Sequence, residues 1–270
     1  MPSIGIFDSG VGGLTVLKAL KLALPEESFV YLGDTARLPY GTKSPETIRL
    51  YLEQNIRFLV SCGVKALVVA CNSASTVLAS DHWDDLPIYG VIGPGAQAAY
   101  AASNGRIGVL GTRATVESNA YVKALHELDP TLEVIQQACP LLVPLVEEGW
   151  EQDAVTDEVL RRYLEKPLEA GIDTLILGCT HYPVLKDRIA AIAGENVTLV
   201  DSADVIAARV QAGLQCGFIS AGRREGSKIF TTDLNHVFQE VGRRILSPLE
   251  VNSWEAADIQ NKREHAEKQS

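Results

Sequence analysis

Residues 173–185 read DTLILGCTHYPVL, an apolar run that ends at a glycine and is followed by a cysteine and a histidine two positions apart. A run of this length and composition is typical of a strand that is buried on both faces. The segment at 66–76, ALVVACNSAST, repeats the pattern, because its apolar run also stops at a cysteine, Cys71. The two segments therefore predict buried strands that each carry a thiol at the carboxyl end.

The rest of the chain alternates between short apolar runs and segments with the helical period of apolar residues. This alternation predicts an α/β fold of mostly parallel sheets that are flanked by helices. The predicted strands are 4–7, 28–32, 66–70, 88–92, 107–110, 132–135, 174–177, 197–200 and 228–231. The predicted helices are 13–23, 45–62, 73–80, 95–103, 114–127, 155–170, 183–193, 203–213 and 235–245.

Two parts of the chain resemble each other, which predicts two similar domains. IGIFDSGVGGLTV (4–16) and IGVLGTRATVESN (107–119) both read as a strand, a turn of small residues and the start of a helix. These segments begin 103 residues apart, and the two cysteine turns lie 108 residues apart. The expected parts are a first domain, 1–92 plus 208–270, with Asp8 and Cys71, and a second domain, 93–207, with Cys179 and His181.

The composition argues against several classes of partner. The chain has 34 acidic and 24 basic residues among its 270, a formal net charge of −10. Such a protein is repelled by nucleic-acid phosphates and by anionic lipids, so we expect neither nucleic acid nor a membrane as a partner. The opening residues MPSIGIFDSG lead directly into a predicted strand, and the five cysteines are widely spaced. We therefore expect a cytoplasmic protein with reduced thiols.

Ligands of parallel α/β sheets bind at the carboxyl ends of the strands. This rule selects the turns at 7–13, 33–42, 71–76, 111–115 and 178–183, which include the two cysteine turns and the glycine-rich turn FDSGVGG. That turn also raises the alternative of a dinucleotide site. It lacks the last glycine of the GxGxxG pattern, however, and Asp8 would lie beside a pyrophosphate. The dinucleotide alternative is therefore disfavoured.

A pair of thiols at two strand ends has few uses. Two cysteines and one histidine without CxxC spacing disfavour a metal site. A redox disulfide between Cys71 and Cys179 stays open as an alternative. The polar residues that follow each cysteine favour a third use, in which one thiol takes a proton from one face of a substrate and the other supplies a proton to the opposite face. The alternative without a chemical role is that both cysteines are buried structural residues.

A thiol that acts as a base needs a partner that tunes or exchanges its proton. Asp8 is a candidate partner for one cysteine, and His181 is a candidate for the other. The plainer roles are a helix cap for Asp8 and a backbone-bonded core side chain for His181. In PLVEEG, at 144–149, either Glu147 or Glu148 is a candidate to face the second cysteine.

Taken together, these segments resemble the glutamate racemases of the aspartate/glutamate racemase superfamily. The resemblance extends from residue 4 to about residue 203 and rests on IGIFDSGVGGLTV, YLGDTARLPYGTKSPETI, VVACNSAST, GVLGTRATVESNAY, CPLLVPLVEEG and DTLILGCTHYPVL. It implies two α/β domains and a cofactor-independent, two-base racemisation of L- and D-glutamate in the cleft. It further implies D-glutamate supply for peptidoglycan in a bacterial cytoplasm, and a homodimer.

The resemblance also implies roles by motif position. Cys71 would be the base for D-glutamate, assisted by Asp8. Cys179 would be the base for L-glutamate, assisted by His181 together with Glu147. The residues implied to hold the substrate are Asp8, Ser9, Tyr40, Gly41, Asn72, Ser73, Thr115, Thr180 and His181.

Two other functions remain as alternatives. A related racemase would act on aspartate or another acid, and a binding or redox-sensing module would use the thiols as a disulfide pair.

Racemisation makes one further demand on the site, because an amino-acid α-carbon is a very weak acid. Without a pyridoxal electron sink, hydrogen-bond donors to the α-carboxylate must stabilise the carbanion-like state.

Overall fold

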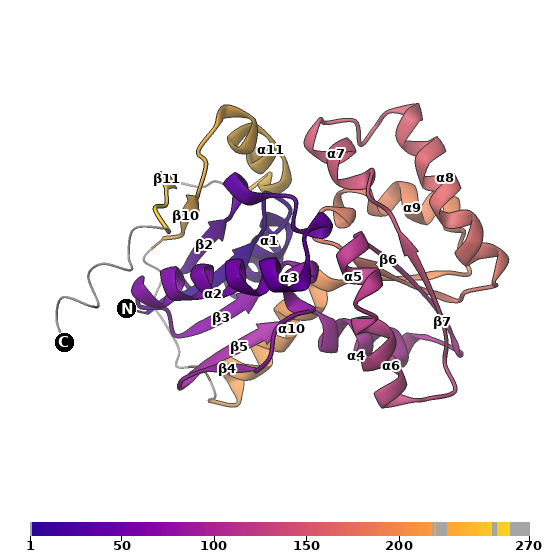
Figure 1. The fold of residues 1–270 in the computed structure, drawn as a ribbon, viewed down its shortest axis with the longest axis horizontal. Coiled ribbons are helices and arrows are strands. Elements are labelled where there is room, and N and C mark those ends of the chain that lie inside the picture. The colour runs from indigo at the N-terminus through magenta and orange to yellow at the C-terminus, as the bar shows by residue number, and fades with distance from the viewer. Residues whose placement is uncertain (1, 218, 220–225, 250–252, 260–270) are drawn as a thin grey trace.

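The computed structural model describes residues 2–217, 219, 226–249 and 253–259. It contains two separate sheets with helices packed on their faces, one sheet of seven strands and one of four (Figure 1). The predicted α/β class, with mostly parallel sheets flanked by helices, is therefore confirmed, although the two sheets differ in size.

The larger sheet has the strand order β11-β10-β2-β1-β3-β5-β4. All its neighbouring strands pair in parallel except β4 and β5, which are antiparallel. The central strands are buried along their whole length, as expected from their continuous apolar runs. The strands are β1 (Ile4–Asp8), β2 (Phe29–Gly33), β3 (Ala66–Val69), β4 (His82–Trp83), β5 (Leu86–Gly90), β10 (Lys228–Thr231) and β11 (Trp254–Ala256).

The smaller sheet has the order β7-β6-β8-β9, and all its pairs are parallel. Its central strand β8 (Thr174–Gly178) is the apolar run of the segment 173–185 and is fully buried. The other strands are β6 (Arg106–Gly111), β7 (Glu133–Ala138) and β9 (Thr198–Asp201).

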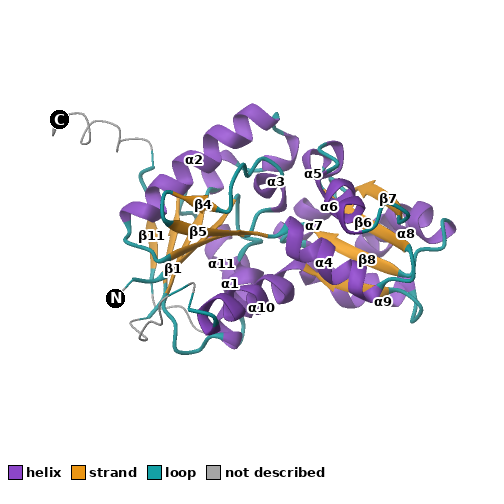
Figure 2. Cartoon of the chain, turned by 90° about the horizontal axis from the view of Figure 1, so that it is seen from below, coloured by secondary structure: helices purple, strands orange, loops and turns teal. Residues whose placement is uncertain are grey.

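Helices cover both faces of the larger sheet. Side chains of α1 (Leu14–Ala23), α10 (Ser202–Gln215) and α11 (His236–Leu246) form one core cluster with it. Side chains of α2 (Pro45–Ser61) and α3 (Asn72–Ser75) form a cluster on the other face. Figure 2 shows α2 and α10 on opposite sides of this sheet.

The smaller sheet is covered in the same way. One face packs against α4 (Ile92–Ala102) and α6 (Ala120–Leu128). The other face packs against α7 (Leu142–Glu147), α8 (Ala154–Glu169) and α9 (Lys186–Ala193). The remaining short elements are α5 (Arg113–Glu117) and the 3₁₀ turns η1 (Thr35–Arg37), η2 (Tyr40–Thr42) and η3 (Tyr182–Leu185).

All nine predicted strands are present, and two strands were missed. The edge strand β4 is only two residues long. The strand β11 begins at Trp254 and continues into the polar segment 255–270, for which the sequence predicts a surface helix or a frayed end. That expectation is wrong for residues 255 and 256, because they pair with β10, and Trp254 packs edge-on against Phe238 with ring centroids 5.5 Å apart. Residues 260–270 lie outside the described part of the chain.

Two helix predictions need correction. The helix predicted at 73–80 is only Asn72–Ser75. At its last residue, Ser75 Oγ donates to the carbonyl of Val69 at 3.0 Å, a local side-chain bond of the kind that competes with helix continuation. The helix predicted at 114–127 is divided into α5 and α6 by Asn119, whose backbone is left-handed with a φ of 54°. The helix α7 was not predicted.

We propose the division into 1–92 plus 208–270 and 93–207 for the two domains. The boundary at 208 falls inside α10, and residues at the start of that helix share the core of the larger sheet. Within the described ranges, no helix is long and apolar enough to cross a membrane.

Candidate active site

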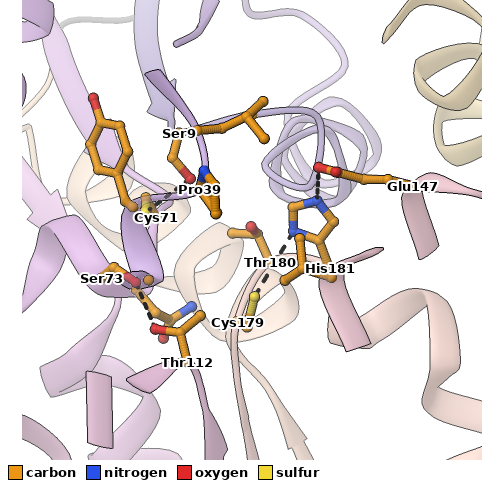
Figure 3. Close-up of a pocket in the computed structure, with 15 residues that line it drawn as sticks. Ser9, Pro39, Cys71, Ser73, Thr112, Glu147, Cys179, Thr180 and His181 are labelled. Atoms are coloured by element: carbon orange, nitrogen blue, oxygen red, sulfur yellow. Dashed lines mark hydrogen bonds and ion pairs between the residues drawn. The ribbon is translucent and has the colours of Figure 1, made fainter. Parts of the chain in front are cut away.

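A cavity lies where the carboxyl ends of the strands in the two sheets face each other (Figure 3). The cavity is small, with a volume of about 30 Å³, and it is partly open to solvent. Both predicted cysteines line it, together with residues from six loops and helices. The lining residues are Ser9, Gly10, Leu38, Pro39, Tyr40, Gly41, Cys71, Asn72, Ser73, Thr112, Val143, Glu147, Cys179, Thr180 and His181.

Cys71 stands just beyond the end of β3 and forms the N-cap of α3. Its sulfur accepts from the backbone N–H of Ala74 at 3.5 Å and donates to Ser9 Oγ at 3.5 Å. Burial, followed by the negative charge of Asp8, raises the pKa of Cys71 to about 12. At neutral pH the free protein therefore holds Cys71 as a thiol.

Cys179 follows the last residue of β8 and has a different partner. Its sulfur lies 3.9 Å from Nδ1 of His181, and Nε2 of the same ring lies 3.2 Å from Oε1 of Glu147 (Figure 3). Burial acts to lower the pKa of His181, but the hydrogen bonds to Cys179 and Glu147 outweigh it and raise the pKa to about 10. The sulfur thus contacts a cationic imidazole that can give or take its proton.

Asp8 is fully buried and does not line the cavity. Its carboxylate accepts from the backbone N–H groups of Gly10 and Gly13, at 3.0 Å each, and from Thr180 Oγ1 at 3.2 Å. Burial raises the pKa of Asp8, while the positive charge of His181 and these hydrogen bonds act to lower it. Among the described residues no hydrogen bond joins Asp8 to Cys71. The carboxylate instead ties the first strand of the larger sheet to the Cys179 loop.

The wall between the two thiols is polar but uncharged. Ser73 Oγ lies 2.8 Å from Thr112 Oγ1, and Thr112 Oγ1 lies 3.1 Å from Thr115 Oγ1. Thr115 is fully buried behind this pair and does not line the cavity. Asn72 is 2% exposed, and its Nδ2 has no hydrogen-bond partner in the described structure. The wall thus offers hydroxyls and an unused amide donor.

Tyr40 and Gly41 bring the larger sheet's loop against the smaller sheet. The hydroxyl of Tyr40 donates to Asp34, so this end of the side chain points away from the cavity. A Cβ at Gly41 would lie only 2.5 Å from Cβ of Thr112, which explains why the loop has a glycine there. The two halves can therefore approach closely here because Gly41 has no side chain.

The structure brings most of the predicted site residues together and adds several more. Of the two candidate glutamates, Glu147 lines the cavity and Glu148 does not. Thr112, not Thr115, reaches the cavity, and its place directly after β6 as the N-cap of α5 was a signal in the sequence. Four further lining residues lie in the turns that the sequence selected but were not singled out there: Gly10, Leu38, Pro39 and Thr112. Val143 lies outside those turns and was not predicted.

A disulfide and a metal site are the two other uses of the thiols that were considered from the sequence. Cys71 and Cys179 are not joined in a disulfide. Within the described ranges, no group of three or more His, Cys, Asp or Glu side chains is placed to hold a metal ion.

Two mostly parallel sheets, and one cavity between them with a thiol on each side, define an α/β protein with a candidate small-molecule site between its two halves. A family model described as Asp/Glu/Hydantoin racemase matches residues 12–210 of the chain. The chain belongs to the Asp/Glu/Hydantoin racemase family.

Individual relatives agree with this membership. A glutamate racemase of Geobacter metallireducens is 49% identical over 249 residues, which are 90% of this chain and 92% of that protein. The solved glutamate racemase RacE1 of Bacillus anthracis has a TM-score of 0.88 at 39% identity, over 95% of this chain and 97% of its own. The glutamate racemase of Francisella tularensis, solved in complex with D-glutamate, has a TM-score of 0.86 at 33% identity. The match covers 96% of this chain and 98% of that one.

Proposed function

We propose that this protein interconverts L- and D-glutamate by direct proton transfer at the α-carbon, without a cofactor. The observation that carries the proposal is the pair of thiols, Cys71 and Cys179, on the two sides of one cavity. The similarity of the whole chain to glutamate racemases supports glutamate as the substrate. Two opposed acid–base groups are what inversion at a carbon requires, since the proton leaves one face and arrives at the other.

The proposed reaction conserves protons within the site. For L-glutamate, the thiolate of Cys179 takes the α-proton, and the thiol of Cys71 donates its own proton to the opposite face. The product is D-glutamate, with Cys179 now a thiol and Cys71 a thiolate. The raised pKa of Cys71 supports this direction for the free protein, because Cys71 begins as the proton donor. D-glutamate reacts by the same steps in reverse.

His181 and Glu147 are proposed to manage the proton of Cys179. The imidazole lies between the sulfur and a carboxylate that is partly exposed, with 27% of its side chain accessible. A cation beside a cysteine stabilises the thiolate, and the exposed carboxylate gives a route by which the proton exchanges with solvent. Asp8 is proposed to act on Cys71 through its charge, because no hydrogen bond joins them in the described structure.

Neutral donors are proposed to hold the two carboxylates of glutamate. Asn72, Ser9 and Ser73 line the cavity, and Asn72 Nδ2 is buried without a hydrogen-bond partner in the described structure. Thr180 also lines the cavity, but its hydroxyl donates to Asp8. Fixed donors around an α-carboxylate stabilise the negative charge that spreads onto it when the α-proton leaves. Tyr40 and Gly41 close the same wall.

The decisive experiment follows the optical activity of L-glutamate in the presence of the purified protein and no added cofactor. We expect the signal to decay to zero, because the two enantiomers are equally stable. In D₂O, both enantiomers should gain deuterium at the α-carbon. Unchanged optical activity with glutamate would refute the proposal, and faster decay with aspartate would reassign the substrate.

The wider role follows from this activity. We propose that the protein supplies D-glutamate for peptidoglycan in the bacterial cytoplasm and works as a homodimer. Light scattering at several protein concentrations tests the assembly, for which a mass near twice 29.2 kDa is expected. A constant mass of one chain would refute the dimer.

The Gly12→Ala substitution tests how closely the larger sheet's first turn holds the Cys179 loop. A Cβ at Gly12 would lie 2.6 Å from Cε1 of His181 and 2.6 Å from Oγ1 of Thr180. Both side chains must then move, and a misplacement of about 1 Å can cost about 10²-fold in rate. We expect kcat/KM for glutamate to fall by about 10²-fold. Gly93→Ala is the matched control, because a Cβ there meets nothing within 4 Å; equal activity of both variants would contradict the prediction.

A further inference from the structure

We infer that Tyr121 is a positioning residue that orients the side-chain amide of Asn72 toward the substrate. Tyr121 lies on α6, beside the smaller sheet, and Asn72 is the first residue of α3, beside the larger sheet. The tyrosine hydroxyl donates to Oδ1 of Asn72 at 2.7 Å, so the hydrogen bond joins the two halves of the molecule next to Cys71. Tyr121 does not line the cavity and acts only through Asn72.

The hydrogen bond selects one of the two orientations of the amide. Tyr121 is fully buried, and a buried hydroxyl proton without an acceptor costs free energy. Only the orientation with Oδ1 toward Tyr121 gives this proton an acceptor. Nδ2 must then point the other way, and it is the atom that is buried without a hydrogen-bond partner in the described structure.

The position of the tyrosine is itself tightly set. A Cβ at Gly95 would lie 3.2 Å from the hydroxyl oxygen of Tyr121, and a Cβ at Gly178 would lie 3.2 Å from its ring. The ring is therefore held between α4 and the end of β8, at the glycine that precedes Cys179. Burial raises the pKa of Tyr121, so the hydroxyl stays protonated and remains a donor.

The consequence concerns the substrate and rests on the proposed function. A carboxylate accepts hydrogen bonds and cannot donate them, so it binds to the Nδ2 face of an amide and not to the Oδ1 face. Tyr121 thus decides whether Asn72 attracts or repels a carboxylate of glutamate. Because Tyr121 and Asn72 belong to different halves, this orientation also requires that the two halves be correctly docked.

The Tyr121→Phe variant removes the hydroxyl and keeps the ring. We expect KM for glutamate to rise about tenfold, with a smaller change in kcat, since loss of one such hydrogen bond is worth about this factor. Tyr100→Phe is the control, because Tyr100 is 42% exposed and should leave both constants unchanged.

A double-mutant cycle separates positioning from a general structural role. If Tyr121 acts through Asn72, Tyr121→Phe should change KM by less than about twofold once Asn72→Ala is present. Effects that multiply in the double variant would overturn the inference.

The Asn72→Asp variant tests the same orientation from the other side. Its carboxylate would face that of the substrate, and we expect glutamate binding to be lost in calorimetry. Binding as tight as in the wild type would overturn the inference, even if Tyr121→Phe failed to fold. A wild type that neither binds nor racemises glutamate would instead refute the proposed function. The ¹⁵N signal of the Asn72 side chain would then still report whether Tyr121→Phe alters its hydrogen bonding.

Discussion

Replacing Cys71 or Cys179 with alanine is expected to lower kcat/KM for glutamate by about 10³-fold or more, the range in which single acid–base groups contribute. The loss should be equal in the two directions, because the equilibrium constant between enantiomers is one. Both thiols are needed for inversion, since each faces the cavity from its own sheet. Polarimetry of L- and D-glutamate measures the effect, and Cys216→Ala, at an exposed cysteine, is the control.

Deuterium exchange distinguishes the two cysteines, although their rate losses are alike. With Cys71 removed, Cys179 can still take the α-proton of L-glutamate, exchange it through His181 and return deuterium to the same face. L-glutamate should therefore gain deuterium without inversion in Cys71→Ala, and D-glutamate should do so in Cys179→Ala. The reverse pattern would exchange the assignments of the two faces, and racemisation within tenfold of wild type in either variant would refute the two-thiol mechanism.

The two thiols could be predicted because their signal is local. An apolar strand that stops at a cysteine places the thiol at the carboxyl edge of a parallel sheet, and the structure has Cys71 and Cys179 at that edge. The choice between Glu147 and Glu148 could not be made from the sequence. Both residues read as a helix end, and only the packing of α7 decides that Glu147 faces the cavity. Thr112 and Thr115 are both hydroxyl residues of one helix start, and only the packing of the two sheets decides which of them reaches the cavity.

Contacts between segments that lie far apart in the chain could not be predicted from the sequence. Asp8 reads as a cap or a proton partner in its own turn, yet its third hydrogen bond comes from Thr180, 172 residues away. The strand β11 is only three residues long, and it depends on its pairing with β10 and on the contact of Trp254 with Phe238. Such features depend on the docking of whole elements, which local periodicity does not encode.

The His181→Asn substitution is expected to reduce kcat/KM by about 10²-fold, because it removes the group that exchanges the proton of Cys179. Asparagine keeps a polar side chain near Glu147 but does not titrate. Glu147→Gln should cost less, since this carboxylate is partly exposed and acts through the imidazole. Steady-state rates with L-glutamate check both variants. A Glu147→Gln variant with a larger loss than His181→Asn would place the critical group at Glu147.

The pH dependence of stability gives an independent test of His181. Its pKa is raised from 6.5 to about 10 in the folded protein by the hydrogen bonds to Cys179 and Glu147, against the opposing effect of burial. The folded state then binds more protons than the unfolded state between these two values, so the contribution is complete below pH 6.5 and is lost as the pH rises toward 10. The slope is at most about 1.4 kcal/mol per pH unit.

Urea unfolding of wild type and His181→Asn, at several pH values across this window, measures that contribution directly. We expect the difference in the free energy of unfolding to favour the wild type most at the acidic end and to shrink steadily as the pH rises. His236→Asn is the matched control, because that side chain is 85% exposed. A difference that grows with pH would mean that the folded protein holds His181 as a neutral imidazole. The sulfur of Cys179 would then lack its cationic partner, and its proton would need another route.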